Sequence, residues 1–340
     1  MDPLTHVVIG RAVVAAARDR ARDRAVGAAA ILGALSPDVD SALAFDGWDR
    51  YVRAHQFGTH SIAGALVTAS LAAALVAAIA PVVRRWRARD DEPPPPPFTT
   101  LLAAAAAGAM SHIALDLASG ARIAVAWPIV GRRVSAPLVA MADPWFVAIT
   151  VGGLTILRLG RVRLHTAARY VVAAAAIFLA VKAALLALAL RRADVHPAAV
   201  SAIEARWGSL TGWYVFERAS DEVRASTISS RGGLPIGYLI RPLAPESAIV
   251  GASRSLDDVE NFLAVHEFAF AAETPDEDDR IAVMWSDLRY CWPPPGADDA
   301  PAPRASPRCG VWVGGVYDRG GHAITEEVRI GRVVQRRPPR

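Results

Sequence analysis

Long apolar runs separated by short basic turns occupy roughly the first 190 residues of the chain. Residues 61–83 give 23 consecutive positions without a charged side chain. A helix of that length, rising about 1.5 Å per residue, is long enough to cross a hydrocarbon core of about 30 Å. Further runs follow at 98–115, at 144–157, which is short for a span, and at 170–190, where Lys182 is the only charge.

Two weaker apolar segments, 4–17 and 25–35, precede these runs and are joined by a basic turn at 18–24. They are typical of a short helical hairpin that either spans the membrane or is partly embedded in it. An acidic and proline-rich stretch at 90–97 predicts a stiff, solvated connection between two spans. The pattern therefore predicts a mainly α-helical membrane domain over residues 1–192, a bundle with about four to six membrane helices.

After residue 192 the pattern changes to mixed polar sequence with short alternating or aromatic-rich runs. Such runs predict a small antiparallel sheet in a β-rich α+β domain outside the membrane, residues 193–340. Strands are expected at 213–217, 236–240, 281–285, 311–317 and 328–334, helices at 196–207 and 256–265, and a long loop at 293–307.

The two cysteines, Cys291 and Cys309, both lie in this C-terminal part. They form a disulfide if the domain faces an oxidising compartment, and two unpaired thiols fit the sequence equally well. The pair His266-Glu267 and the single His322 are interpreted as solvated side chains rather than as ligands.

Charge supports a membrane protein rather than a nucleic-acid-binding one. The formal net charge of +4 comes from arginine, because Lys182 is the only lysine, and 53% of the residues are hydrophobic. The arginines form short clusters between apolar runs, which indicates membrane topology rather than a nucleic-acid surface. The chain opens without a basic segment and Arg11 interrupts the first apolar stretch, so no secretory signal peptide is expected.

The distribution of arginine also predicts the orientation in the membrane. If the chain crosses at each run, the side of His6 and of the C-terminal domain carries seven arginines near the membrane. The opposite side, with its turns at 18–24, 84–97 and 158–166, carries eleven. By the positive-inside rule the opposite side is cytoplasmic, and His6 lies at the non-cytoplasmic face of the membrane.

The same alternation places seven metal-binding side chains at one membrane face: His6, Asp38, Asp40, His55, His60, His112 and Asp116. Imidazole and carboxylate together bind zinc or manganese well, and residues four apart on a helix, such as His112 and Asp116, share one face. Taken singly, each has an ordinary alternative: a helix cap for Asp38 or Asp40, an interfacial position for His6, an inter-helix hydrogen bond for His112. Their convergence on one face favours a metal site.

The residues also carry a resemblance to a known family. Four ordered motifs, Met1–His6, Ser36–Asp40, His55–Ser61 and His112–Asp116, resemble those of the YdjM-type inner-membrane proteins, commonly labelled membrane-bound metal-dependent hydrolases. Asp143-Pro144 fits the same pattern, and Ser286–Tyr290 is a weaker echo. Gln56 departs from the arginine that is usual there, which puts a substrate or phosphate contact in doubt but not metal ligation.

More distantly the pattern is similar to zinc-dependent phospholipases C and related single-strand nucleases. That similarity implies a divalent metal, zinc in the first place and manganese as the alternative. It also implies one or two ions, because the further ligands of a three-zinc cluster have no counterpart here. In this interpretation all seven residues are candidate ligands, and His55 and Asp40 are also the candidates for the catalytic base.

The function expected is metal-dependent hydrolysis of a phosphodiester or phospholipid-like substrate at the bilayer surface, with no nucleic-acid partner. Two rivals stay open. An ion or small-molecule transporter also keeps His and Asp near membrane helices, but strings them through the depth of the bilayer. A non-catalytic scaffold that uses metal to staple its helices predicts a closed site with four ligands.

Overall fold

The computed structural model describes residues 1–17, 23–45, 51, 55, 57–87, 95–193, 202–219, 222–232, 236–242, 244, 247–276, 279–292 and 308–339. The chain divides into two compact units, which are described separately here. The first holds mainly the residues up to Leu186, together with Glu204–Leu210, and the second holds mainly the residues that follow. The basic turn at 18–22 and the predicted loop at 293–307 lie outside the described residues. The domain boundary at 192/193 stays a prediction.

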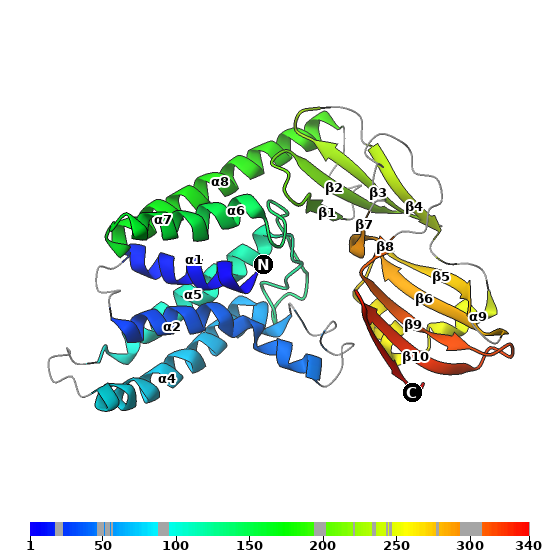
Figure 1. Ribbon diagram of the computed structural model, residues 1–340, viewed down its shortest axis with the longest axis horizontal. Coiled ribbons are helices and arrows are strands. Elements are labelled where there is room, and N and C mark those ends of the chain that lie inside the picture. Colours follow the sequence, from blue (N-terminus) through cyan, green and yellow to red (C-terminus); the bar gives the residue numbers. More distant parts are fainter. Residues whose placement is uncertain are drawn as a thin grey trace. The chain divides into compact units, whose positions relative to one another are not determined.

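The first unit is helical (Figure 1). Its helices are α1 (Pro3–Ala17), α2 (Arg24–Leu35), α4 (Ile62–Arg87), α5 (Phe98–Ala118), α6 (Pro144–Val147), α7 (Gly153–Leu159) and α8 (Leu164–Arg192). Two 3₁₀ segments, η2 (Ser36–Phe45) and η3 (Gly58–His60), lie between α2 and α4, and a π-helical turn, η4 (Ala148–Gly152), joins α6 to α7.

Four helices in the described part of the chain are long and apolar enough to cross a membrane: Arg24–Leu43, Ile62–Trp86, Phe98–Ala118 and Leu164–Arg192. The prediction of a helical membrane bundle with an added β-rich region is confirmed. The sequence predicted 25–35 as a weaker segment than 144–157, and this order was wrong. The weak run at 25–35 belongs to a span because 3₁₀ turns extend it beyond Leu35, whereas Pro144–Leu159 is a shorter helix interrupted by η4.

Glycine allows the two central helices, α2 and α5, to pack backbone against backbone. A Cβ atom at Gly33 would lie 2.1 Å from the carbonyl oxygen of Ala105, and one at Gly108 would lie 2.2 Å from that of Ala30. Small residues at such contacts are typical of helix association in membranes, where close packing replaces the hydrophobic effect. The α2–α5 contact therefore requires glycine at both positions.

The outer helices α4 and α8 instead present large apolar side chains outward. Leu71 is 66% exposed on α4, and Ile177 is 65% exposed on α8. A water-soluble monomer rarely exposes continuous apolar surface of this kind, whereas lipid covers it at no cost. These faces are consistent with a bundle surrounded by lipid.

The C-terminal region holds two antiparallel sheets and a short third one, where the sequence predicted a single sheet. The first has the order β1-β2-β3-β4, with β1 (Ala202–Ala205), β2 (Gly212–Arg218), β3 (Glu222–Ser229) and β4 (Ile236–Pro242). The second has the order β11-β10-β9-β6-β5, with β5 (Ala269–Pro275), β6 (Ile281–Asp287), β9 (Val311–Tyr317), β10 (Ala323–Ile330) and β11 (Val333–Arg337). Two short helices, α9 (Ala248–Ser253) and α10 (Asp257–Leu263), pack with the second sheet through a core that includes Trp285 and Tyr317.

Three expectations for this region were wrong. The helix predicted at 196–207 is described from residue 202 on, and there Ala202–Ala205 form strand β1, which pairs with β2. The strand predicted at 328–334 is the end of β10 and the start of β11, separated by a turn in which Gly331 has a φ of 60°. His266 is buried rather than solvated: its Nδ1 donates to the carbonyl oxygen of Phe262, and its Nε2 lies 2.9 Å from the hydroxyl of Tyr290.

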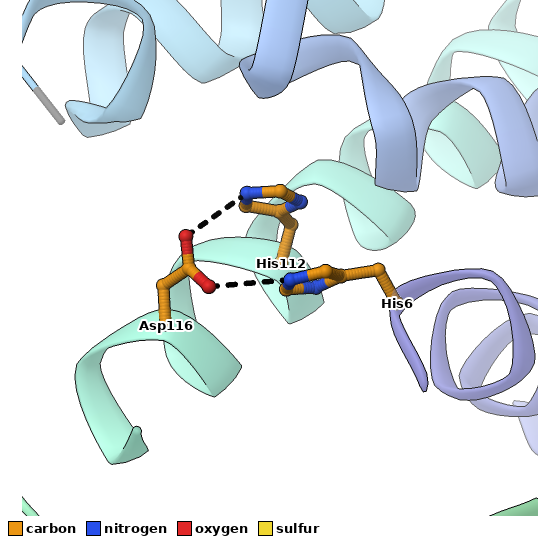
Figure 2. Close-up of side chains that lie close together, drawn as sticks. All are labelled: His6, His112 and Asp116. Carbon is orange, nitrogen blue, oxygen red and sulfur yellow. Dashed lines mark ion pairs between the residues drawn. The ribbon is translucent and has the colours of Figure 1, made fainter. Parts of the chain in front are cut away.

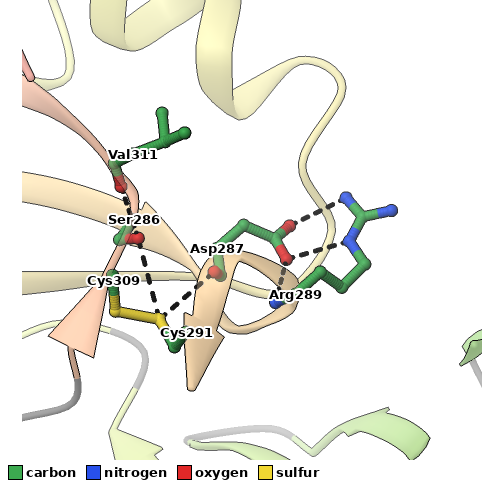
Figure 3. Close-up of a disulfide and its surroundings, with 6 residues drawn as sticks. All are labelled: Ser286, Asp287, Arg289, Cys291, Cys309 and Val311. Atoms are coloured by element: carbon green, nitrogen blue, oxygen red, sulfur yellow. Dashed lines mark hydrogen bonds and ion pairs between the residues drawn. A yellow bond between two sulfur atoms is a disulfide. The ribbon is translucent and has the colours of Figure 1, made fainter. Parts of the chain in front are cut away.

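Cys291 and Cys309 form a disulfide, which decides between the two readings that the sequence left open (Figure 3). The two cysteines face each other in the short sheet of β7 (Cys291–Trp292) and β8 (Arg308–Cys309).

Beside the disulfide, Asp287 is fully buried and accepts hydrogen bonds from the guanidinium of Arg289. Burial opposes the charge of this carboxylate, but the Arg289 guanidinium holds the pKa of Asp287 below its ordinary value.

Candidate metal centre

The seven candidate ligands come from four separate segments that meet at one end of the helical unit. His6 lies in the first turns of α1, and Asp38 and Asp40 lie in η2, directly after α2. His60 ends η3, immediately before α4, and His55 precedes it. His112 and Asp116 lie in the last two turns of α5.

Three adjoining groups result, and each contains three residues whose ligand atoms lie within 4.8 Å of one another. The first consists of His6, His112 and Asp116 (Figure 2). Nε2 of His6 is 3.2 Å from one carboxylate oxygen of Asp116, and Nε2 of His112 is 3.1 Å from the other. The two imidazole rings stack with 3.8 Å between their centroids, so both nitrogens face the same carboxylate.

The second group shares His112 with the first and adds Asp38 and His60. Nε2 of His60 lies 3.3 Å from Oδ1 of Asp38, and Nε2 of His112 lies 3.5 Å from the same oxygen. His60 is also 3.6 Å from Oδ2 of Asp116, which joins the first two groups into one cluster.

The third group lies on the other edge of the His60 ring and contains Asp40 and His55. Nδ1 of His60 is 3.3 Å from Oδ2 of Asp40, and Nδ1 of His55 is 3.1 Å from Oδ1 of the same carboxylate. Asp40 therefore lies between two imidazoles. Its second oxygen also accepts a hydrogen bond from the hydroxyl of Thr59 at 3.0 Å.

The donor set fits a divalent cation by two observations. Nε2 of His6, His60 and His112 is buried, and in the described part of the chain its close polar contacts are to carboxylate oxygens of Asp38 and Asp116, none of them aligned as a hydrogen bond. A buried imidazole nitrogen without an aligned hydrogen bond is costly, unless a ligand occupies its lone pair. The separations of 3.1 to 3.6 Å between these nitrogens and the Asp38 and Asp116 oxygens also match the spacing in a tetrahedral site, about 3.4 Å for ligands about 2.1 Å from zinc.

A backbone carbonyl orients one of these rings. Nδ1 of His112 lies 2.7 Å from the carbonyl oxygen of Ala34, at the end of α2. A proton on Nδ1 satisfies that contact and leaves the lone pair of Nε2 directed at Asp116 and Asp38. Such an outer contact fixes the tautomer of a metal-binding histidine. Because Ala34 follows Gly33, this contact depends on the close approach of α2 and α5.

The metal-free cluster holds a charge on His60. Burial favours the neutral ring, but the neighbouring carboxylates of Asp38 and Asp40 outweigh it and raise the pKa of His60 to about 9. A divalent cation bound among these carboxylates would therefore compete with this proton.

The site is closed on most sides and open on one. The side chains of His6, His60 and His112 are fully buried, whereas those of Asp38 and His55 are 31% and 22% exposed. Solvent therefore reaches the cluster from the side of Asp38 and His55.

Sequence reasoning did not identify Thr59 or the Ala34 carbonyl. Thr59 belongs to the motif His55–Ser61, so its position beside His60 could have identified it. A contact made by a backbone carbonyl cannot be recognised from residue types. The amino group of Met1 also contacts Asp116. Asp143 lies elsewhere and caps α6, accepting hydrogen bonds from the backbone of Trp145 and Phe146. The roles of the seven residues as ligands stay predictions.

Comparison with protein families gives one match. The family model described as YdjM inner membrane protein matches residues 1–192. Neither the curated proteins nor the solved structures yield a match. The more distant similarity to phospholipases C and nucleases stays a prediction.

Proposed function

The chain belongs to the YdjM inner membrane protein family, and from that premise we propose that it is a membrane-embedded, metal-dependent hydrolase of a phosphodiester substrate. The observation that carries the proposal is the set of three buried Nε2 atoms without hydrogen bonds, directed at the carboxylates of Asp38 and Asp116. A phospholipid-like substrate is favoured because the cluster lies where membrane-spanning helices begin and end, at the level of lipid headgroups.

We assign the ligands by the direction of the imidazole nitrogens. Five residues direct donor atoms at one another and would hold one or two divalent cations, zinc in the first place: His6, Asp38, His60, His112 and Asp116. Asp40 lies on the Nδ1 side of His60, where it serves to orient that ring. His55 contacts Asp40 alone among the carboxylates of the cluster.

When bound, the cation supplies an activated water and neutralises charge on the phosphoryl oxygens. The residues of the chain do the rest. Asp40 holds the tautomer of His55 with its proton on Nδ1, so the lone pair on Nε2 is the base. His55 takes a proton from water as the water oxygen bonds to phosphorus, the ester P–O bond breaks, and the same proton passes to the leaving oxygen.

The arrangement weighs against both rival functions. A transport pathway needs polar groups through the depth of the membrane, whereas these seven residues gather at one end of the helices. A structural metal site is closed and saturated by four ligands. Here five donors converge, and Asp38 and His55 remain open to solvent.

We place the site and the C-terminal domain on the non-cytoplasmic side. This orientation takes the two shorter apolar helices, Pro3–Ala17 and Pro144–Leu159, as crossing the membrane together with the four long ones. The excess of arginine on the opposite face supports this orientation, and so does the disulfide, because such bonds persist in oxidising compartments. A phosphatase reporter that is active only outside the cytoplasm should be active when fused after Arg340 and inactive when inserted in the turn at 158–163. The reverse pattern would overturn the orientation.

The metal is tested by elemental analysis of detergent-purified protein. We expect near-stoichiometric divalent metal in the wild type and loss of it in Asp116→Asn and His112→Ala. The matched control is His165→Ala, since Nδ1 of His165 also contacts a backbone carbonyl, that of Ala15, but His165 belongs to none of the three groups. Wild-type metal content in both site variants, or no metal in reconstituted wild type, would refute the site.

The reaction is tested with bis(p-nitrophenyl) phosphate and with a fluorescent phospholipid in the metal-loaded protein. His55→Ala should keep its metal and lose about 10²–10⁴-fold in rate, the usual contribution of a general base. An inactive wild type with full metal content would leave the metal site standing and refute hydrolysis of these substrates.

A further inference from the structure

The segment between α5 and α6, residues 119–143, folds back on itself beside the metal centre. Its two arms meet at the bridges Ser119–Pro137 and Ile123–Val134, with 2.9 Å hydrogen bonds in both directions between Ile123 and Val134. Ile123 is fully buried, so the base of this hairpin is fixed to the helical unit.

The hairpin is tied directly to the site-bearing segments. The amide of Ala121 donates to the carbonyl of Asp116, and the amide of Ile62, at the start of α4, donates to the carbonyl of Val125. The Trp127 ring packs edge-on against Phe57, which precedes η3 and His60. The base of the hairpin therefore lies where two candidate membrane spans, α4 and α5, reach the membrane surface.

The tip of the hairpin, residues 126–134, is both apolar and basic. Ile129 is 90% exposed, and Trp127 and Val130 are also exposed. Arg132 and Arg133 follow at once, and the guanidinium of Arg133 lies 5.2 Å from the centre of the Phe57 ring. The sequence from residue 117 to residue 142 has three arginines and no acidic residue.

We propose that this tip is a lipid-binding element, in which Trp127, Ile129 and Val130 insert into the membrane interface and Arg132 and Arg133 bind anionic phospholipid headgroups. Tryptophan and arginine are the side chains that suit the headgroup layer, because each joins an apolar part to a polar one. The net positive charge is complementary to anionic lipid. A position at the ends of two spans brings the tip to the right level without any other partner.

The proposal goes beyond the hydrolase function and does not depend on catalysis. It implies that phosphate-bearing headgroups gather next to the metal centre, since the hairpin and the segment 57–60 share the Phe57–Trp127 contact. The surface is therefore tested by lipid contact alone, with or without metal.

The test uses a single reporter cysteine in the full chain. The sequence has two cysteines and they form the disulfide, so an introduced thiol is the only one that labels under non-reducing conditions. Ile129→Cys is labelled with an environment-sensitive fluorophore in nanodiscs of phosphatidylcholine and phosphatidylglycerol, and Val130→Cys replaces it if labelling fails. Leu71→Cys on α4 is the lipid-facing reference, and Val333→Cys on β11 is the water-facing one, with exposures of 66% and 60%.

We expect brominated phospholipid to quench the label at residue 129 as strongly as the label at residue 71, and not the label at residue 333. Brominated phosphatidylglycerol should quench more than brominated phosphatidylcholine, and Arg132→Gln with Arg133→Gln should reduce this preference about fivefold per arginine. A label at residue 129 as accessible to water as that at residue 333 would overturn the proposal. So would a dry label that no bromolipid quenches, which would indicate contact with a second copy of the chain.

Discussion

Substitution of Gly33 by alanine tests whether helix packing sets the geometry of the metal centre. The added Cβ would lie 2.1 Å from the Ala105 carbonyl oxygen and 2.6 Å from its carbon. An ordinary C···O contact is about 3.3 Å or longer, so α2 and α5 must separate by roughly 1 Å. The obstacle is backbone rather than the end of a flexible side chain, and no rotamer change relieves it.

The displacement reaches the site through one hydrogen bond. Ala34 follows Gly33, and its carbonyl oxygen is 2.7 Å from Nδ1 of His112. Adding roughly 1 Å lengthens that contact to about 3.7 Å, beyond the limit of a hydrogen bond at about 3.5 Å. Loss of an outer contact to a metal-binding histidine typically weakens the metal about 10–100-fold, and overpacking costs about 1–3 kcal/mol of stability.

The assay is a competition between the detergent-solubilised protein and a chromophoric chelator, with thermal unfolding measured in parallel. The control is Gly153→Ala in α7, where the nearest atom to the added Cβ would be Cγ2 of Val171 at 3.7 Å, an ordinary contact. We expect the control to bind metal as the wild type does. Equal affinity in Gly33→Ala and Gly153→Ala would refute the coupling of helix packing to the site.

Three further predictions concern protons, the disulfide and the buried lysine. Because His60 in the metal-free protein has a pKa raised to about 9 and must lose its proton to bind, apparent metal affinity should rise up to about tenfold per pH unit below pH 9 and then level off. A titration that shows no pH dependence would contradict this. Cys309→Ser opens a loop with a sequence separation of 18 and should lower the unfolding free energy of the C-terminal domain by about 3 kcal/mol in denaturant, with metal content unchanged. Lys182→Met removes hydrogen bonds of 3.0 and 3.3 Å to two carbonyls of residues 209–210 and should expose that segment to protease, whereas unchanged cleavage would refute a role for Lys182 in holding it.

Hydrophobic runs predicted the helical part well because a membrane span needs length and apolarity, and both are visible in one sequence. The exception was the segment that begins at Arg24. Its span is completed by 3₁₀ turns that carry Asp38 and Asp40, and charged residues lower the apparent hydrophobicity of a window whose backbone is still helical. The polar residues of the candidate site thus made the span that positions them harder to recognise from the sequence.

The β-rich part was harder to predict because its strands depend on their partners. The sequence of β5, from Ala269 to Pro275, has three alanines and one aromatic residue, and it is a strand because it pairs along its whole length with β6. The run at 328–334 has β-branched residues on both sides of the turn at Gly331, so composition alone merged two strands into one. Tertiary pairing decides such segments, whatever their local propensity.

The candidate site was predictable as a set of residues but not as a geometry. Chain alternation placed seven side chains at one face, yet it treated Asp38 and Asp40 alike. The structure separates them, because Asp38 faces Nε2 of His60 and Asp40 faces Nδ1. The two carboxylates thus contact opposite edges of the same imidazole ring: Asp38 is the proposed ligand, and Asp40 orients the ring. The spacing of residues in the sequence does not encode this difference.

Two different kinds of interaction hold the segments of this candidate site together. The α2–α5 contact rests on glycine packing that is complete without any ion, and it places His112 and Asp116 beside Ala34. Residues 36–60 reach the cluster through imidazole–carboxylate contacts, in which His60 must bear a proton or a metal to neutralise the acids around it. The helical half therefore presents three of the proposed ligands, counting His6, and the segment 36–60 would complete the proposed site when a cation replaces the proton on His60. In the proposed metal site, a cation would therefore enter and leave from the open side, where Asp38 and His55 meet solvent.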